Sequence, residues 1–207
     1  VFALLMGCKP GAYWNLLKDP AHGVDFSKKY GKAAMLMNVG LYGLFIVLYY
    51  NLIGATFNGI TFGCIFCMLA CCNSGSNPKT VWPIMVGYVA ASYVAQSVCS
   101  LTGAEHTLMA NAQAIVIGLC FANGLSPVTG VYGWLAGVLF GMIHYTFVTC
   151  VPLLHGAFCL YNGGFTAAFT CFLFITVLEH FCKTKKERRE LRALKLLYIR
   201  GCVMFYC

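Results

Sequence analysis

The sequence predicts an all-α, polytopic membrane helix bundle with about six membrane segments. Of its 207 residues, 60% are hydrophobic and only 10% are charged, and the mean hydropathy is +0.76. Soluble domains average roughly 25% charged residues, so this much apolar surface needs the lipid bilayer as its solvent. The apolar runs are too long for barrel strands and lack the alternation of apolar and polar residues that such strands show.

Six apolar runs reach or approach the roughly 20 residues that a membrane helix needs. The second and fourth runs are short, so a re-entrant or broken helix is an alternative to a full crossing at those two places. The stretches NSGSNP (73–78) and NGLSP (123–127) have the composition of turns and separate neighbouring runs. The six runs are residues 33–52, 57–72, 81–99, 107–123, 131–151 and 160–181.

Basic residues predict the orientation. Eight of the 14 Lys and Arg residues lie between Lys183 and Arg200, and five others precede the first apolar run. Because basic loops stay on the cytoplasmic side, we expect the protein to lie in a cell membrane with both of its ends in the cytoplasm. An even number of crossings, such as six, allows this arrangement. The chain then divides into a polar loop or interfacial segment (1–32), a transmembrane bundle (33–181) and a basic cytoplasmic tail (182–207).

Two Asn-Gly stretches stand at the starts of long apolar runs. GATFNG (54–59) and GAFCLYNG (156–163) each follow a full apolar run, and each leads into a run rich in Phe, Cys, Thr and Ala. This recurrence predicts an internal repeat that relates residues 33–72 to residues 131–181. Transporters build solute sites from interrupted helices at corresponding positions of two repeats.

We therefore expect the two Asn-Gly pairs to begin broken or shortened helices that face each other beside a solute pathway. The alternative for each pair is a turn that caps an ordinary helix at the membrane surface. Two histidines fit the same pathway: His144 lies in the middle of an apolar run, where ionisable groups are functional candidates, and His155 shortly precedes the second Asn-Gly pair. For His144, an interhelical hydrogen bond is an equally good interpretation. The predicted pathway residues are Asn58, Gly59, His144, His155, Tyr161, Asn162 and Gly163.

Enzyme chemistry has little support in the sequence. It contains no G-x-S-x-G, no H-E-x-x-H and no phosphate-binding loop. Cys64 and Cys67 form a C-x-x-C, but a zinc site needs further ligands, so we expect these thiols to pack between helices. We predict no enzyme, no catalytic residue, no cofactor and no metal, with a membrane enzyme built on His144 or His155 as the least favoured interpretation.

Three stretches resemble a known family. They are SNPKTVWPIMVGYVAAS (76–92), LSPVTGVYGWLAGVLFGMIHY (125–145) and LLHGAFCLYNGGFTAA (153–168). They are similar to a family of uncharacterised bacterial multi-pass membrane proteins, a domain of unknown function built from two similar halves, and the resemblance covers residues 33–181. It implies a bacterial inner membrane protein. More distantly, NAQAIVIGLCFANGLSP (111–127) with the later Y-N-G resembles the half-repeat of urea transporters, in which a similar segment borders the pore.

The function that fits best is a transporter or channel for a small neutral or weakly charged solute, because the spans carry few fixed charges to balance those of a multivalent ion. The alternative is a structural or assembly protein of the membrane that transports nothing. The expected partners are membrane lipid and a small-molecule solute, with a homo-oligomer left open. We expect no nucleic acid, because the basic block directly follows a membrane span. Since the chain starts at Val1, we also expect it to be a piece of a longer protein.

Overall fold

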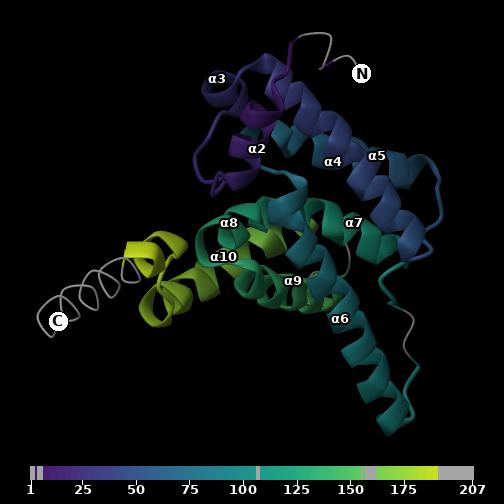
Figure 1. The fold of residues 1–207 in the computed structure, drawn as a ribbon. Helices are drawn as coiled ribbons and strands as arrows, with labels where there is room; N and C mark the ends of the chain where they lie inside the picture. Colours follow the sequence, from purple (N-terminus) through teal and green to yellow (C-terminus); the bar gives the residue numbers. More distant parts are fainter. Residues whose placement is uncertain (1–2, 4–6, 106–107, 155, 157–161, 191–207) are drawn as a thin grey trace, which may run out of the picture.

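The computed structural model describes residues 3, 7–105, 108–154, 156 and 162–190. Every regular element within these residues is a helix, which confirms the predicted all-α fold (Figure 1). The elements are α2 (Pro10–Lys18), α3 (Phe26–Tyr30), α4 (Lys32–Leu52), α5 (Gly59–Ala70), η1 (Cys71–Ser74), α6 (Pro78–Thr102), α7 (Gln113–Ala122), η2 (Asn123–Leu125), α8 (Ser126–Tyr132), α9 (Trp134–Leu154) and α10 (Asn162–Phe181).

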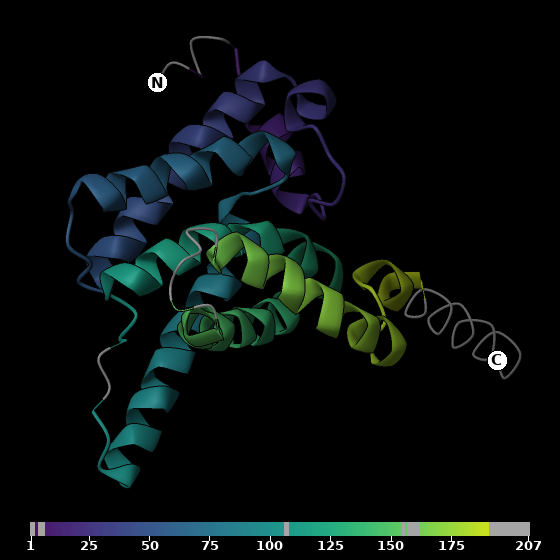
Figure 2. The same ribbon diagram turned by 180° about the vertical axis from the view of Figure 1, so that it is seen from behind.

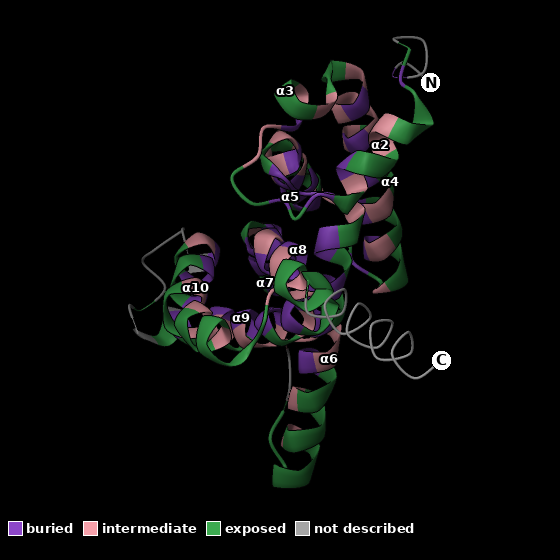
Figure 3. Ribbon diagram, turned by 60° about the vertical axis from the view of Figure 1, so that its left-hand side comes forward, coloured by how far each residue is buried: buried purple, intermediate pink, exposed green. Residues whose placement is uncertain are grey.

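Five helical segments are long and apolar enough to cross a membrane, and a sixth, shorter apolar segment covers Gly59–Ser74. Large apolar side chains point outward from these helices, among them Leu52, Leu101 and Leu153, which are 77%, 88% and 84% exposed. Figure 3 shows exposed residues along the outward faces of the helices, most visibly along the C-terminal half of α6. An apolar outer surface of this kind suits lipid rather than water, so the helices indicate a membrane-embedded protein. The five long segments are Lys32–Leu52, Pro78–Thr102, Gln113–Tyr132, Trp134–Val151 and Gly163–Glu190.

The turn expected at 123–127 is wrong, because this stretch is helical and continues α7 through η2 into α8. Asn123 is buried, and both ends of its amide are bonded: its Oδ1 accepts from the Tyr42 hydroxyl at 2.8 Å, and its Nδ2 donates to the Met68 carbonyl at 3.2 Å. Pro127 falls in the first turn of α8, where its missing N–H interrupts no helical hydrogen bond. The fourth apolar segment therefore runs over 113–132 instead of ending at residue 123.

The N-terminal segment is folded. Its helices α2 and α3 bury Leu16 and Phe26 completely, and these side chains form a small core of their own with Ala34 at the start of α4. The segment lies at one end of the bundle, beside the start of α4 (Figures 1 and 2). Residues 10–30 are therefore a helical cap on the bundle, and their place relative to the membrane surface stays a prediction.

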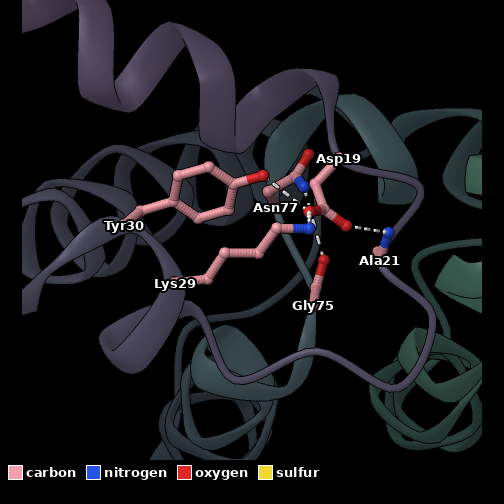
Figure 4. Close-up of polar contacts among 6 residues, drawn as sticks. All are labelled: Asp19, Ala21, Lys29, Tyr30, Gly75 and Asn77. Atoms are coloured by element: carbon pink, nitrogen blue, oxygen red, sulfur yellow. Dashed lines mark hydrogen bonds and ion pairs between the residues drawn. The ribbon is translucent and has the colours of Figure 1, made fainter.

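A buried carboxylate holds this cap together (Figure 4). The side chain of Asp19 accepts hydrogen bonds from the Ala21 backbone N–H at 2.8 Å and from the Lys29 ammonium and the Tyr30 hydroxyl, both at 2.6 Å. Burial raises the pKa of Asp19, but the three hydrogen bonds together with the positive charge of Lys29 outweigh burial and hold that pKa below its ordinary value. The cap touches the loop before α6 so closely that a methyl group at Gly75 would lie 2.7 Å from the Ala21 carbonyl oxygen.

Helices α6 and α9 cross in backbone contact. A methyl group at Gly141 would lie 2.5 Å from the Ile84 carbonyl oxygen, and one at Gly87 would overlap the Val138 carbonyl. Small residues allow membrane helices to approach this closely, which compensates for the absence of a hydrophobic driving force between helices in lipid. This contact fixes the relative position of the two helices that supply Tyr88 and His144, whose side chains meet in the site described below.

In two pairs of neighbouring helices, both members run in the same direction through the bundle. Trp82 stacks on Trp134 at the starts of α6 and α9, and Tyr88 meets His144 further along both helices, so α6 and α9 run in the same direction. Helices α5 and α7 also run in the same direction. Their starts are joined by the hydrogen bond from Asn58 to Gln113, and near their ends the Met68 carbonyl of α5 accepts from Asn123, which follows α7. Both pairs are compatible with the predicted orientation, and the side that faces the cytoplasm stays a prediction.

Candidate functional site

The second Asn-Gly helix begins level with the middle of a membrane helix. His144 is the central residue of the 21-residue α9, a helix about 31 Å long. Its Nε2 lies 3.0 Å from the carbonyl oxygen of Gly163, which is the second residue of α10. Helix α10 therefore starts beside the midpoint of α9 and not beside its end.

His144 is completely buried at this point and both of its ring nitrogens have partners. The Tyr88 hydroxyl lies 2.5 Å from Nδ1, and the Thr166 hydroxyl lies 3.0 Å from Nε2 and donates to the Gly163 carbonyl at 2.9 Å. Because a carbonyl oxygen can only accept, we assign the ring hydrogen to Nε2, so that Nδ1 accepts from Tyr88. This arrangement satisfies a neutral imidazole.

Further buried hydrogen bonds extend the polar interior in two directions. Along α10, the Thr170 hydroxyl donates to the Thr166 carbonyl at 2.7 Å. Toward α7, the Tyr145 hydroxyl donates to the Leu108 carbonyl at 2.5 Å, and the Tyr145 ring packs edge-on against Tyr88. Hydroxyl, imidazole and backbone groups from α6, α9, α10 and the segment before α7 thus gather in one part of the bundle.

Gly163 is packed too tightly to carry a side chain. A methyl group there would lie between 2.5 and 2.9 Å from three atoms of Phe121, on α7. Asn162 begins α10 as predicted, but its side chain lies outside the described part of the chain, as do His155 and Tyr161. Of the four predicted residues around this start, the structure therefore places Gly163 and the backbone of Asn162.

At the first Asn-Gly pair, the Asn58 side chain caps the start of α5 and also bonds to the side-chain amide of Gln113. The Asn58 Oδ1 accepts from the Thr61 backbone N–H at 3.0 Å, and its Nδ2 donates to the Gln113 Oε1 at 2.8 Å. The Nε2 of Gln113 is buried and has no hydrogen-bond partner among the residues that the structure describes. Gly59 follows the cap without crowding, since no atom lies within 4 Å of a methyl group placed there.

The two starts lie at opposite ends of α7. Asn58 bonds to Gln113 at the first residue of α7, whereas Gly163 packs on Phe121 near its last, a separation of about 12 Å along the helix. Helix α7 contacts both α5 and α10 and sets their starts at different levels, and a shared pathway between the two starts stays a prediction. His144 joins the second start only.

A comparison with known protein families places the chain. The model of a family described as "Protein of unknown function (DUF1576)" matches residues 11–180. The chain belongs to this family. No curated protein and no solved structure matches the chain. The match confirms the predicted membership of an uncharacterised domain family, and since it begins in α2, the N-terminal cap of this DUF1576 protein is part of the family's domain.

Sequence reasoning missed two of the groups that surround His144 in this DUF1576 protein. Tyr88 lies 56 residues before His144, and nothing in its local sequence distinguishes it from other aromatic residues of the spans. Thr166 carried a usable signal, because a residue three positions after Gly163 lies on the same face of α10. Among the described residues, no group of three His, Cys, Asp or Glu side chains is arranged to hold a metal ion.

Proposed function

We propose that this DUF1576 protein is a transporter or channel that passes a small neutral or weakly charged solute across a cell membrane. The observation that carries the proposal is the start of α10 beside the midpoint of α9, where Gly163 meets His144. The first N–H groups of a helix have no partner within the helix. Inside a membrane, interrupted backbone is tolerated only when it is buried in protein or lines a water-filled cavity, and transporters place their solute sites at such interruptions.

The groups around this start favour a solute without a large net charge. Tyr88 and Thr166 offer hydroxyls, Gly163 offers a carbonyl, and His144 is assigned as neutral. These groups can exchange hydrogen bonds with a passing molecule. A multivalent ion would find no fixed opposite charge here to offset the large cost of removing its water.

Gln113 supplies the second element of the proposed pathway. Its buried Nε2 has no described partner, and a buried donor without a partner costs roughly 1–3 kcal/mol. An oxygen atom of the solute would satisfy this donor, so we assign the pair formed by Asn58 and Gln113 to the entrance. His144 and Gly163 then form the inner part of the same route.

The helix lengths support the proposed internal repeat. Helices α4 and α9 each have 21 residues, and the next helix in the chain after each begins at an Asn-Gly pair. The distant likeness to a urea-transporter half-repeat belongs to the same proposal and suggests a small amide as the first solute to test. A bacterial inner membrane is the proposed location.

A structural or assembly role is the second candidate. It is favoured by the partners already present on both ring nitrogens of His144 and by the tight contact between Gly163 and Phe121. These contacts join four helices, α6, α7, α9 and α10, without needing a solute. The two candidates differ in one measurable property, which is solute flux.

The test is flux into proteoliposomes across a panel of neutral amides, amines and small acids. We expect at least one neutral amide to enter several-fold faster than into empty vesicles, and Gln113→Leu to reduce that flux several-fold. Asn51→Leu is the matched control, because the Asn51 amide is exposed and, within the described part of the chain, its hydrogen bond is to the Val47 carbonyl of its own helix. Absence of flux for every solute, or equal flux in Gln113→Leu and Asn51→Leu, would favour the structural role.

A further inference from the structure

Two basic side chains beyond α10 are anchored on the end of α8. The Lys185 ammonium donates to the Thr129 carbonyl at 2.8 Å, and the Arg188 guanidinium donates to the Tyr132 carbonyl. Cations near a helix C-terminus satisfy its last carbonyls and interact favourably with its dipole. These contacts hold residues 183–190 beside α8 (Figure 1).

The anchoring gathers positive charge beside the start of α9. A methyl group at Gly133, which immediately precedes α9, would lie 3.6 Å both from the Lys185 Cε and from the Arg188 Nη2. Lys79 and Arg189 are also close enough to repel the charge of Lys185. Four cations therefore surround one point of the surface, and their repulsion opposes the folded arrangement unless an anion joins them.

No carboxylate in the described part of the chain forms an ion pair with these four cations, since the ion pairs found there belong to Lys28 and Lys29. Glu179 and Glu187 lie near Tyr132 and interact electrostatically with its side chain. The Glu187 carboxylate accepts a hydrogen bond from the Thr184 backbone N–H at 2.7 Å. The four cations have no ion-pair partner among the described residues, and they can contact an outside anion.

A stacked tryptophan pair adjoins the cations. The rings of Trp82 and Trp134 lie 6.3 Å apart with planes 21° from parallel, and the residues are 38% and 56% exposed. Trp82 follows Lys79 by three positions on α6, so the two share a helix face, and Trp134 follows Gly133 directly. Exposed tryptophan in a membrane protein is typical of the interface between headgroups and acyl chains.

The helix directions strengthen the site. Helices α6 and α9 both start at this point, so the partially positive N-termini of two long helices lie near the same surface as the cations. Backbone N–H groups at helix starts favour phosphate. Basic side chains, helix starts and aromatic rings at the depth of the lipid headgroups are three features that a phospholipid would use together.

We propose that Lys79, Lys185 and Arg188, with the Trp82–Trp134 pair, form a binding site for the phosphate headgroup of an anionic phospholipid. The cations would contact the phosphate, and the tryptophan rings would lie along the adjacent glycerol and upper acyl chain. A free phosphate ion would use the cations only and would leave the exposed rings without a role. The site is independent of the proposed solute pathway.

The experiment uses the whole chain in a mild detergent, with Trp14→Phe so that fluorescence reports only Trp82 and Trp134, the other two of the three tryptophans. The protein is titrated with phosphatidylglycerol or phosphatidylcholine, each carrying bromine on its upper acyl chain to quench nearby tryptophan. We expect phosphatidylglycerol to quench at a several-fold lower mole fraction, and inorganic phosphate to compete poorly. Equal quenching by the two lipids would overturn the proposal, and strong competition by inorganic phosphate would identify a site for a free anion instead.

Variants separate this site from general attraction to a basic segment. Lys185→Gln with Arg188→Gln should reduce the preference for phosphatidylglycerol several-fold. Lys183→Gln with Lys186→Gln removes the same charge from exposed neighbours and should leave the preference unchanged. An equal loss in both pairs contradicts a defined site.

A single variant covers the case in which the double variant does not fold. Lys79 is exposed and forms no side-chain hydrogen bond or ion pair within the described chain, so Lys79→Gln should fold normally. It should reduce the preference at least two- to three-fold by the loss of one nearby charge, about 0.5 kcal/mol. An unchanged preference in Lys79→Gln overturns the assignment.

Discussion

The starts of α5 and α10 share an Asn-Gly pair but differ in what surrounds it. The start of α5 lies close to the end of α4, where Gly54 of the connecting segment approaches Asn111, and Gly59 has open space around it. The start of α10 lies beside the middle of α9, with Gly163 against Phe121. The same local sequence therefore begins a helix in both places, and the neighbouring helices decide whether that start is an end of the bundle or part of its interior.

Gly163→Ala should have the largest effect. Its methyl group would overlap Phe121, and overpacking of this kind typically costs about 1–3 kcal/mol. The free energy of unfolding, measured by titration with sodium dodecyl sulfate in mixed micelles, should fall by that amount. A loss below about 0.5 kcal/mol, the usual range of a surface substitution, would show that the two starts are not packed differently.

His144→Leu tests whether the polar contacts of the interior start matter. The substitution leaves the Tyr88 hydroxyl without its acceptor, and we expect a loss of about 1–2 kcal/mol in the free energy of unfolding. Tyr88→Phe removes the same bond while keeping the ring. In a double-mutant cycle the two losses should therefore be less than additive, and strict additivity would contradict the bond between them.

Asn58→Ala should have a smaller effect at the first start. It removes the cap that Asn58 provides for the Thr61 N–H, and the loss of such a cap costs about 1 kcal/mol. Asn58→Asp keeps the capping oxygen but cannot donate to Gln113, so it should retain most of the stability of the wild-type protein. If the alanine and aspartate variants lose the same stability, the bond to Gln113 and not the cap is the important contact.

Gly59→Ala should have the smallest effect. No atom lies within 4 Å of the added methyl group, so the free energy of unfolding should change by no more than about 0.5 kcal/mol. This variant is the direct counterpart of Gly163→Ala, made at the corresponding position of the other start. A loss as large as that of Gly163→Ala would mean that the glycine serves the Asn-Gly sequence itself and not its surroundings.

The sequence by itself determined the class of the protein and the starts of α5 and α10 at the two Asn-Gly pairs. The bilayer accepts long apolar runs as helices, whatever their neighbours, so the membrane bundle could be predicted from composition and run length. The start at Asn58 was also predictable, because an N-cap acts on backbone groups two or three residues away. Such signals are local, and the residues that carry them are adjacent in the chain.

Only the tertiary structure decided where polar groups meet. Asn123 looked like part of a turn, and contacts with Tyr42 and Met68, 81 and 55 residues away, made it a buried part of a helical segment. Tyr88 and Gly163 similarly became the partners of His144 through the close crossing of α6 and α9 and the depth at which α10 begins. A buried polar group takes whichever partner packing brings within hydrogen-bond distance, so its role depends on the arrangement of distant helices and not on its own sequence.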